Sequence, residues 1–363
     1  MRKKALVYPY NILVASLIRH RDYIKNYEVE YVVSPKGLWF GGKDARESDQ
    51  LFQTGITVTE DYEQALENCD AVIIAEYDTE NVPKFYYRIM DRIKQALENR
   101  KEVFCTLKLK QESVTWLKRY AELCQAKFVY ALDAVEDDLP ENLDMHFVKQ
   151  PETPVVCVLG LSENCSKFEL QMQLHRGLEN MGYRVSHVGS KHYCELMGFH
   201  SFPEFMYQPY RETDKIKALN RYLLSIEEQE NPDIFLIGVP GGMMPVNDKI
   251  ENYFGILPVE TSYAVRGDFN IVSTYYETSV KSSFDVLRDI LKHRLNSPLN
   301  ALCLSNISIN LGSFAENSGA ELEYDIVPPE MLAPVDTENR PVYRIYDSQD
   351  LRNLLHQIEE ELS

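Results

Sequence analysis

The sequence predicts an α/β protein with two parallel sheets, each covered by helices on both faces. Short apolar runs of strand length alternate with amphipathic helical patterns through most of the 363 residues, and this alternation is typical of parallel sheets. The length allows two domains of ordinary size, and the 44% hydrophobic residues can fill a core in each. An acidic and proline-containing stretch at 136–153 predicts a linker between them.

Residues 1–135 are expected to form the first domain. Apolar runs predict strands at Ala5–Tyr8, Val29–Val33, Ala71–Ala75, Val103–Leu107 and Phe128–Leu132. The segment Pro83–Glu98 carries apolar residues at four-residue intervals, which predicts one buried face of a crossover helix. This order of elements indicates a Rossmann-like domain.

This first domain lacks the glycine fingerprint of dinucleotide binders. Tyr8-Pro9-Tyr10-Asn11 follows its opening strand, where glycines would allow close approach of a pyrophosphate. Gly41-Gly42 comes after the second strand and has two interpretations, an anion-binding nest or a plain loop. We favour the loop, because glycine pairs mark turns more often than sites.

Residues 154–297 repeat the alternation of strands and helices. Strands are expected at 155–159, 184–188, 234–239 and 270–274, and helices at 168–181 and 214–228. Residues 298–363 are interpreted as a small acidic C-terminal extension, since 321–363 holds eleven Asp or Glu and three Arg, a net charge of −8. Its final helix carries an apolar stripe, Leu351, Leu354, Leu355, Ile358 and Leu362, which predicts docking on the body.

Charge and cysteine content narrow the class of protein. The formal charge of 38 − 56 = −18 repels nucleic acid and an anionic membrane surface, so neither is an expected partner. No apolar run approaches the roughly 20 residues that span a bilayer. Seven widely spaced cysteines without a Cys-x-x-Cys pair indicate reduced thiols in a cytoplasmic protein. The acidic C-terminal segment offers a further interpretation, a surface for a basic partner, beside the plainer one of a solvated face.

Residues 155–167 have the outline of a phosphate-binding loop. A buried-strand pattern runs into a loop from Gly160 that ends in Lys167 and opens a helix. Ser166 replaces the expected glycine, and Phe168 replaces the Ser or Thr whose hydroxyl binds magnesium. The loop is therefore degenerate, because it lacks the hydroxyl that would bind the magnesium ion needed for cleavage of a nucleoside triphosphate.

Three segments are expected to converge at the carboxyl ends of the second sheet, where open α/β sheets bind ligands. We predict that they form a crevice for an anionic group, and its residues are Gly160, Ser162, Asn164, Cys165, Ser166, Lys167, Gly189, Ser190, Lys191, Gly241 and Gly242. The segment after strand 234–239 offers no carboxylate to organise a metal or water, which points away from hydrolysis. No catalytic base is identified.

Two sharper interpretations remain open. Cys165 lies in a loop at a helix start, where a thiol can act as a nucleophile, although a small loop-filling residue is the plainer explanation. His187, His192, Cys194 and His200 fall within fourteen residues and suggest zinc. Their spacing does not match the compact ligand pairs of structural zinc motifs, so we expect no metal site.

The loop resembles that of dethiobiotin synthetase-like P-loop proteins, whose leading glycine also stands seven residues before the lysine. More widely, 29–134 and 155–273 resemble a two-domain family that includes D-glutamate N-acetyltransferase-like proteins. The segments 160–171, 198–206 and 238–245 resemble a clostridial group described as peptide maturation system proteins. That group is associated with Cys-rich ribosomal peptides, radical SAM maturases and an acyl-carrier-related protein.

The resemblance implies a role in the maturation of a ribosomally synthesised peptide, as an accessory or scaffold protein with a vestigial or metal-independent phosphate-binding crevice. Its partners would be a precursor peptide, a radical SAM maturase or an acyl-carrier-related protein. The alternative that it implies is a transferase that uses an acyl-CoA or a nucleotide on a peptide or amino-acid substrate. Lys167 and Lys191 would then hold the cofactor's phosphates without a metal.

Overall fold

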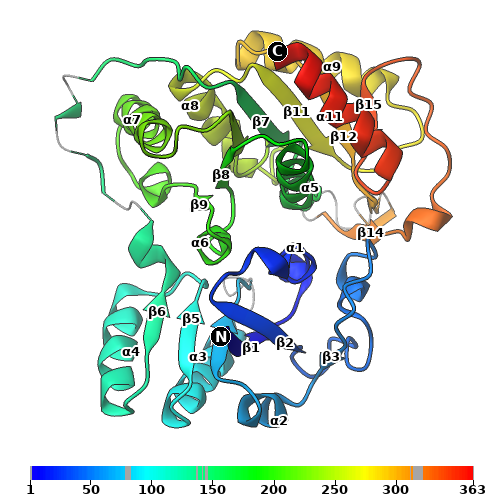
Figure 1. Cartoon of the computed structure of the whole chain (residues 1–363). Helices are drawn as coiled ribbons and strands as arrows, with labels where there is room; N and C mark the ends of the chain where they lie inside the picture. Colours follow the sequence, from blue (N-terminus) through cyan, green and yellow to red (C-terminus); the bar gives the residue numbers. More distant parts are fainter. Residues whose placement is uncertain are drawn as a thin grey trace. The chain divides into compact units, whose positions relative to one another are not determined.

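The computed structural model describes residues 2–77, 83–135, 138–140, 142–143, 146–310, 312–313 and 322–362 (Figure 1). The chain divides into two compact units. The first contains Met1–Val135 together with Lys191–Ser201, and the second contains Glu136–Ser190 and Phe202–Ser363. Each unit is a helix-covered sheet, which confirms the α/β class predicted from the sequence.

The first unit is built on six parallel strands in the order β3-β2-β1-β4-β5-β6. This order is that of the doubly wound dinucleotide-binding fold, with the direction of winding reversing between β1 and β4. The strands are β1 (Lys3–Tyr8), β2 (Tyr27–Val33), β3 (Val58–Thr59), β4 (Ala71–Ile74), β5 (Glu102–Cys105) and β6 (Phe128–Tyr130). The sequence pattern predicts all of them except β3, which has only two residues.

Helices cover this sheet and close its core. They are α1 (Ala15–Arg19), α2 (Tyr62–Glu67), α3 (Pro83–Glu98) and α4 (Gln111–Leu123), and the short α6 (Cys194–Met197) belongs to the same unit. The bounds of α3 match the predicted crossover helix, and Ile89, Ile93 and Leu97 on its apolar face are fully buried. Burying each such side chain stabilises the fold by about 1.5–3 kcal/mol.

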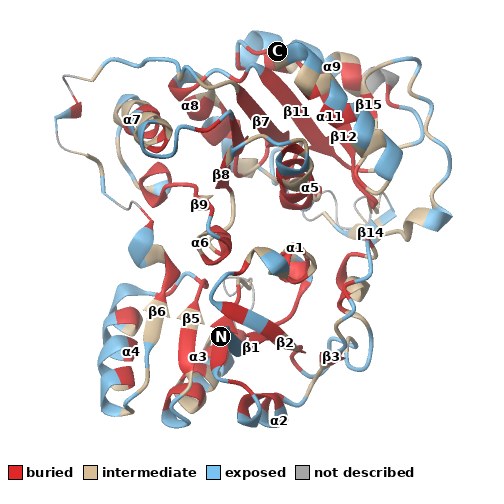
Figure 2. Ribbon diagram, in the orientation of Figure 1, coloured by how far each residue is buried: buried red, intermediate tan, exposed pale blue. Residues whose placement is uncertain are grey.

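The second sheet has seven strands in the order β15-β12-β11-β7-β10-β8-β9. They are β7 (Val155–Gly160), β8 (Val185–Gly189), β9 (His200–Ser201), β10 (Ile234–Gly238), β11 (Phe269–Thr274), β12 (Ala301–Leu304) and β15 (Val342–Arg344). The strands β7, β10, β11 and β12 are buried along their whole length, as expected for parallel strands covered on both faces (Figure 2).

The helices of the second unit are α5 (Lys167–Asn180), α7 (Glu212–Glu230), α8 (Ile256–Ala264), α9 (Lys281–Arg294) and α11 (Ser348–Leu362). A separate antiparallel pair, β13 (Ile307–Ile309) and β14 (Tyr324–Ile326), follows β12. Among the described residues, none of the helices combines the length and the apolar run needed to cross a bilayer.

The described residues after Pro298 contribute to the fold of the second unit. They supply β12 and β15 to the sheet, and α11 packs on α5. Leu354, Leu355 and Ile358 of the expected docking stripe are buried. The contact with α5 is close, because a Cβ placed on Gly177 would lie 2.4 Å from Leu355 Cδ1. The sequence pattern did not indicate this role, because the segment is acidic and its strands β12 and β15 are only four and three residues long.

The expected linker 136–153 is tied to the second unit where it is described. Asn220 of α7 accepts a hydrogen bond from the backbone N–H of Lys149 (3.1 Å) and lies 2.9 Å from His146 Nε2. Residues 136–137, 141 and 144–145 of this segment lie outside the described residues. One buried amide therefore holds together a stretch that has little apolar periodicity of its own.

Residues 191–201 group with the first unit, and the last two of them form β9. The Tyr193 hydroxyl donates to the backbone carbonyl of Leu13 (3.1 Å), and the Phe199 ring lies 5.2 Å from that of Tyr23. Tyr193 and Cys194 are fully buried. The sequence pattern gave no sign of this excursion, because it lies between two strands of one sheet.

Candidate functional site

The loop after β7 keeps the shape of a phosphate-binding loop. Gly160 ends the strand, and a Cβ there would lie 2.9 Å from the Ser162 carbonyl oxygen and 3.0 Å from Cys165 Sγ. Asn164 and Ser166 have φ values of 54° and 55°, in the left-handed region. Left-handed residues within a turn direct successive backbone N–H groups to one side, as in anion-binding nests. The backbone of this loop therefore turns sharply at Asn164 and Ser166.

Lys167 begins α5 and joins this loop to the segment after β10. Its Nζ donates to the carbonyl oxygens of Val239 (2.8 Å) and Gly241 (2.6 Å). The Gly241 carbonyl thus accepts a hydrogen bond from Lys167, whereas we predicted that the Gly241 backbone would contribute to binding an anion. An anion at this place would have to draw the ammonium group away from these two acceptors.

The residues beside Lys167 do not fit a magnesium site of the usual kind. Ser166 caps α5 without a side-chain hydrogen bond to the helix. Phe168, where the metal-binding hydroxyl would be, is buried, and its ring stacks 6.1 Å from that of His187. An aromatic ring held in the core offers no oxygen to a hard cation.

The two glycine-containing segments are also held by side chains. Asn252 donates to Ser162 Oγ (2.9 Å) and to the carbonyl of Met244 (2.9 Å), and the Met243 N–H donates to the Gly160 carbonyl (3.0 Å). A Cβ on Gly242 would lie 2.8 Å from the Asn252 amide nitrogen. The sequence pattern does not indicate Asn252, because this residue lies in a loop whose many charges are typical of a solvent-facing segment.

Cys165 faces inward and is not placed as a nucleophile. Its thiol is 1% exposed and donates to the Ser162 carbonyl (3.2 Å), while the Cys165 carbonyl accepts from Ser273 Oγ (2.6 Å). Burial raises the pKa of the thiol, against a smaller lowering effect of Lys167. The loop-filling interpretation of Cys165 fits this geometry.

We therefore expect iodoacetamide at pH 7.5 to alkylate the half-buried Cys124 well before Cys165, because only an accessible thiolate reacts. Peptide mass spectrometry during the reaction measures both rates. Full unfolding in urea provides the control, in which the two thiols should react alike. Faster labelling of Cys165 in the folded protein would contradict its inert placement.

The remaining predicted residues lie apart from Lys167 in the sheet or in the other unit. Gly189 ends β8, which is separated from β7 by β10, and its carbonyl accepts from the Phe202 N–H (2.9 Å). Ser190 follows it. Lys191 belongs to the first unit, where its Nζ lies 3.2 Å from Glu76 Oε2. We therefore leave Lys191 out of the site around Lys167.

The His and Cys residues of the zinc alternative are also divided. His187 lies in β8 and contacts the Gln171 side chain (3.2 Å), whereas Cys194 is buried in α6 of the first unit. In the described parts of the chain, no group of three or more His, Cys, Asp or Glu side chains is arranged to hold a metal ion.

A cavity of about 730 Å³ lies beside the loop, where β11 ends. Leu161 of the loop lines it together with residues from the end of β11, α9, β13 and the segment after β14. These residues are Thr274, Tyr275, Tyr276, Glu277, Thr278, Ser283, Ser308, Ile309, Val327, Met331, Leu332 and Ala333. The Tyr275 hydroxyl donates to the Glu163 carbonyl (2.5 Å), and its ring stacks on Tyr324 at 5.5 Å. The cavity wall is thus attached to the loop.

Glu277 is the titratable group of this cavity. Burial raises the pKa of its carboxyl, and Ser283 Oγ donates to it at 2.8 Å. A carboxyl with a raised pKa in a cavity is a candidate acid or base. The sequence signal that could have found it is its position three residues after the predicted strand 270–274.

The first unit has no comparable loop after its opening strand. The Asn11 amide donates to the carbonyls of Pro9 and Glu76, both at 2.9 Å. The N–H of Gly42 donates to Val58 O (2.8 Å), and that of Lys43 to Phe40 O (3.1 Å). These N–H groups are engaged within the fold, which agrees with the loop interpretation of Gly41-Gly42.

Comparisons with known proteins address the fold only. No protein-family model matches the chain, and no curated protein matches it. A crystal structure of a DUF1611 family protein from Anabaena variabilis is similar over 84% of this chain and 88% of that one, with a TM-score of 0.59 and 12% identity. A GTPase structure from Pyrococcus abyssi aligns with 57% of this chain and 97% of its own length, at a TM-score of 0.31 and 15% identity. The first likeness supports a shared two-domain, P-loop-like fold.

Proposed function

We propose that this chain is a cytoplasmic accessory protein in the maturation of a ribosomally synthesised peptide, and that it binds peptide beside the 160–167 loop without hydrolysing a nucleotide. The observation that carries the second part is the burial of Phe168 at the metal-binding position. The peptide substrate class comes from the resemblance of 160–171, 198–206 and 238–245 to maturation proteins.

The cavity beside the loop suits a peptide ligand. Its volume of about 730 Å³ lies within the range of small-molecule and side-chain pockets, roughly 300–1,000 Å³. Ile309, Val327 and Leu332 offer apolar contacts, and Glu277 offers a carboxyl that can accept or donate a proton. A precursor peptide could therefore place an apolar side chain against the β13–β14 pair and a polar group near Glu277.

A second candidate is a transferase that uses an acyl-CoA, an acyl carrier or a nucleotide. The curled backbone at Asn164 and Ser166 favours it, since such a turn together with Lys167 can bind phosphate without a metal. Glu277 is then the candidate base. A radical SAM maturase or an acyl-carrier-related protein would be the partner in either case.

One experiment separates the two candidates. Thermal shifts are measured with ATP, GTP, coenzyme A and acetyl-CoA, with and without magnesium, on the wild type, Lys167→Ala and the exposed-site control Lys292→Ala. A ligand at about 100 times its Kd stabilises by roughly 2.7 kcal/mol, a readily measured shift. We expect no magnesium-dependent shift and no hydrolysis. A shift lost only in Lys167→Ala would favour the transferase.

Peptide binding is tested with Leu332→Glu, which puts a charge on the apolar wall of the cavity. The accessory role predicts at least a tenfold weaker affinity for the precursor peptide in this variant and an unchanged affinity in Lys167→Ala. Fluorescence anisotropy with labelled precursor peptide measures both. Equal binding by Leu332→Glu and the wild type would overturn the assignment of this cavity to peptide.

A further inference from the structure

A second cavity, of about 410 Å³, lies in the first unit near the carboxyl ends of β1 and β2. It is lined by Tyr8 and Val33 at the strand ends, by the segment that follows β2, and by one side of α3; the other lining residues are Ser34, Pro35, Lys36, Glu60, Tyr62, Arg88, Asp91, Arg92 and Gln95. Carboxyl ends of parallel strands are where open α/β sheets bind their ligands.

Three cations line this cavity in a protein whose net charge is −18. Of these, Arg92 is already engaged, since its guanidinium lies 2.5 Å from Glu63 and 4.4 Å from the centre of the Tyr62 ring. Lys36 and Arg88 are different, because in the described part of the chain neither forms an ion pair. Two cationic groups are thus available to a ligand.

The acidic residues of the cavity do not cancel these charges. Asp91 lies 3.8 Å from Lys94 on the same helix, which leaves Glu60 as the other carboxylate of the lining. The lining therefore carries three positive and two negative groups. Burial raises the pKa of Tyr8, and Arg92 and Arg88 oppose that shift, which indicates that both guanidinium groups lie near the Tyr8 hydroxyl.

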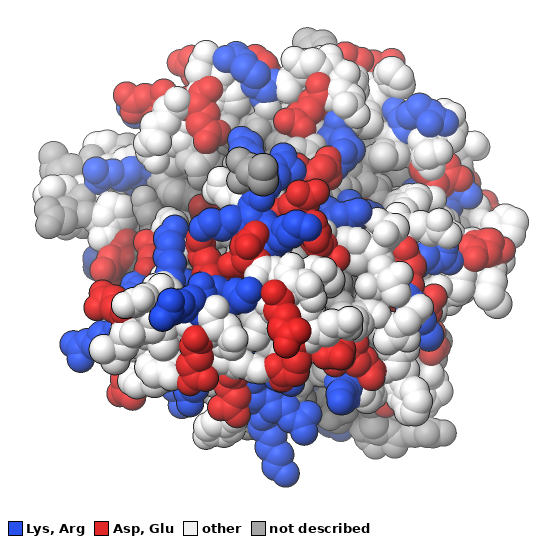
Figure 3. Space-filling model, turned by 60° about the horizontal axis from the view of Figure 1, so that its bottom comes forward, with Lys and Arg blue, Asp and Glu red and all other residues white. Residues whose placement is uncertain are grey.

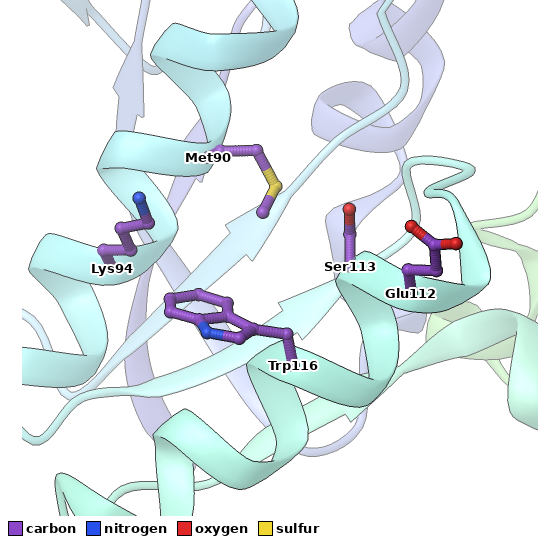
Figure 4. A pocket seen from close by; sticks show the side chains of 5 residues that line it. All are labelled: Met90, Lys94, Glu112, Ser113 and Trp116. Atoms are coloured by element: carbon purple, nitrogen blue, oxygen red, sulfur yellow. The ribbon is translucent and has the colours of Figure 1, made fainter.

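A neighbouring pocket provides the contrast. The pocket of about 280 Å³ between α3 and α4 is lined by Met90, Lys94, Glu112, Ser113 and Trp116 (Figure 4). Its one cation, Lys94, lies 5.3 Å from the centre of the Trp116 ring and close to Asp91. That lysine is held by groups of the protein itself, so we infer no anion site there.

We propose that the cavity at the ends of β1 and β2 binds the phosphate monoester of a small phosphorylated molecule through Lys36 and Arg88. Arg88 presents a planar fork of donors that matches two phosphate oxygens, and Lys36 adds a point charge from the segment after β2. The Tyr8 hydroxyl adds a neutral donor at the end of β1. The site is independent of the 160–167 loop and goes beyond the function proposed above.

Isothermal titration with inorganic phosphate, ribose 5-phosphate and ribose tests the site and its ligand class. The wild type should bind ribose 5-phosphate, and ribose should not bind. Arg88→Ala and Lys36→Ala should each weaken binding at least tenfold, Arg88→Lys should weaken it less, and the control Lys84→Ala on the same helix should leave it unchanged. The three substituted residues are exposed, so the folded state should survive.

Phosphate binding without any preference for the sugar ester would identify a free-phosphate site and keep the assignment of its residues. Affinity that is equal in Arg88→Ala, Lys84→Ala and the wild type would overturn the proposal. The absence of binding by either phosphate compound at 50 mM salt would do so as well, because screening is weakest there.

Discussion

Removal of α11 is expected to unfold the second unit. A chain that ends at Asp347 loses Leu354, Leu355 and Ile358, which are 1%, 8% and 0% exposed. Each such burial stabilises by about 1.5–3 kcal/mol, so their sum approaches the whole stability of an ordinary domain. The truncation also removes Gln357, which donates to the Asn300 carbonyl at 3.2 Å. Urea denaturation followed by circular dichroism measures the loss.

Two point variants in the same helix calibrate this expectation. Ile358→Ala leaves a cavity under α11 and should cost about 2–5 kcal/mol, whereas Glu360→Ala on the exposed face should cost less than about 0.5 kcal/mol. A truncated chain as stable as the full one would show that α11 is dispensable. Because deletion should unfold the unit, it cannot test whether the acidic C-terminal segment binds a basic partner. That test needs charge substitutions such as Glu360→Gln.

Lys215→Met is expected to destabilise the second unit by about 3–5 kcal/mol, because it leaves a buried carboxylate without its cation. Lys215 Nζ lies 2.6 Å from Glu260 Oε1, and these side chains of α7 and α8 are 10% and 2% exposed. A matched double variant, Lys215→Met with Glu260→Leu, should recover most of the loss, since apolar residues of similar size remove the uncompensated charge. A double variant as unstable as the single one would contradict this account.

The destabilisation caused by Lys215→Met should grow as the pH rises. Burial raises the pKa of Glu260 above its ordinary value of 4.5, against the lowering effect of Lys215. The folded state then keeps the proton to a higher pH than the unfolded chain does, so the stability that this group contributes is lost as pH rises through the folded pKa. Without Lys215 that pKa rises further. Urea denaturation at pH 5 and pH 8 should show a larger loss for Lys215→Met at pH 8.

The sequence predicted the elements whose own residues determine them. The strand at 155–160 and the helix Pro83–Glu98 are long or strongly periodic, and the apolar stripe of the last helix is buried as expected. Within the candidate site, the turn at 160–167 follows from Gly160 and Lys167 together with the strand before them. These are local signals, readable within one segment.

What could not be predicted depends on contacts between distant segments. The three-residue strand β15 pairs with β12 across about forty residues, and its sequence carries no long apolar run. Glu277 and Lys36 become cavity residues only when strands end side by side. The sequence pattern led us to expect an anion beside Lys167. In the structure its ammonium group donates to two backbone carbonyl oxygens, and nothing in the sequence of 239–241 indicates these contacts.

Lysine and arginine side chains alternate with acidic ones on the face shown in Figure 3. At the amino ends of the first unit's strands, the buried carboxylate of Glu102 contacts Lys127 (3.3 Å) and accepts from the Tyr27 hydroxyl (2.7 Å). Lys3 also pairs with it, and these neighbours lower the pKa of Glu102 against the effect of burial. The surface charge therefore partly serves to join strands.

The excursion at 191–201 has a consequence for genetic dissection of the protein. A gene fragment that stops at Val135 encodes every strand of the first sheet but omits Tyr193 and Cys194, both fully enclosed in the folded chain. Recombination that exchanges this unit between homologues would have to carry two separate stretches of coding sequence. The first unit is thus compact in the structure but is encoded by two separate stretches of the gene. An independent version of it requires residues 191–201 to be joined to 1–135 by a designed linker.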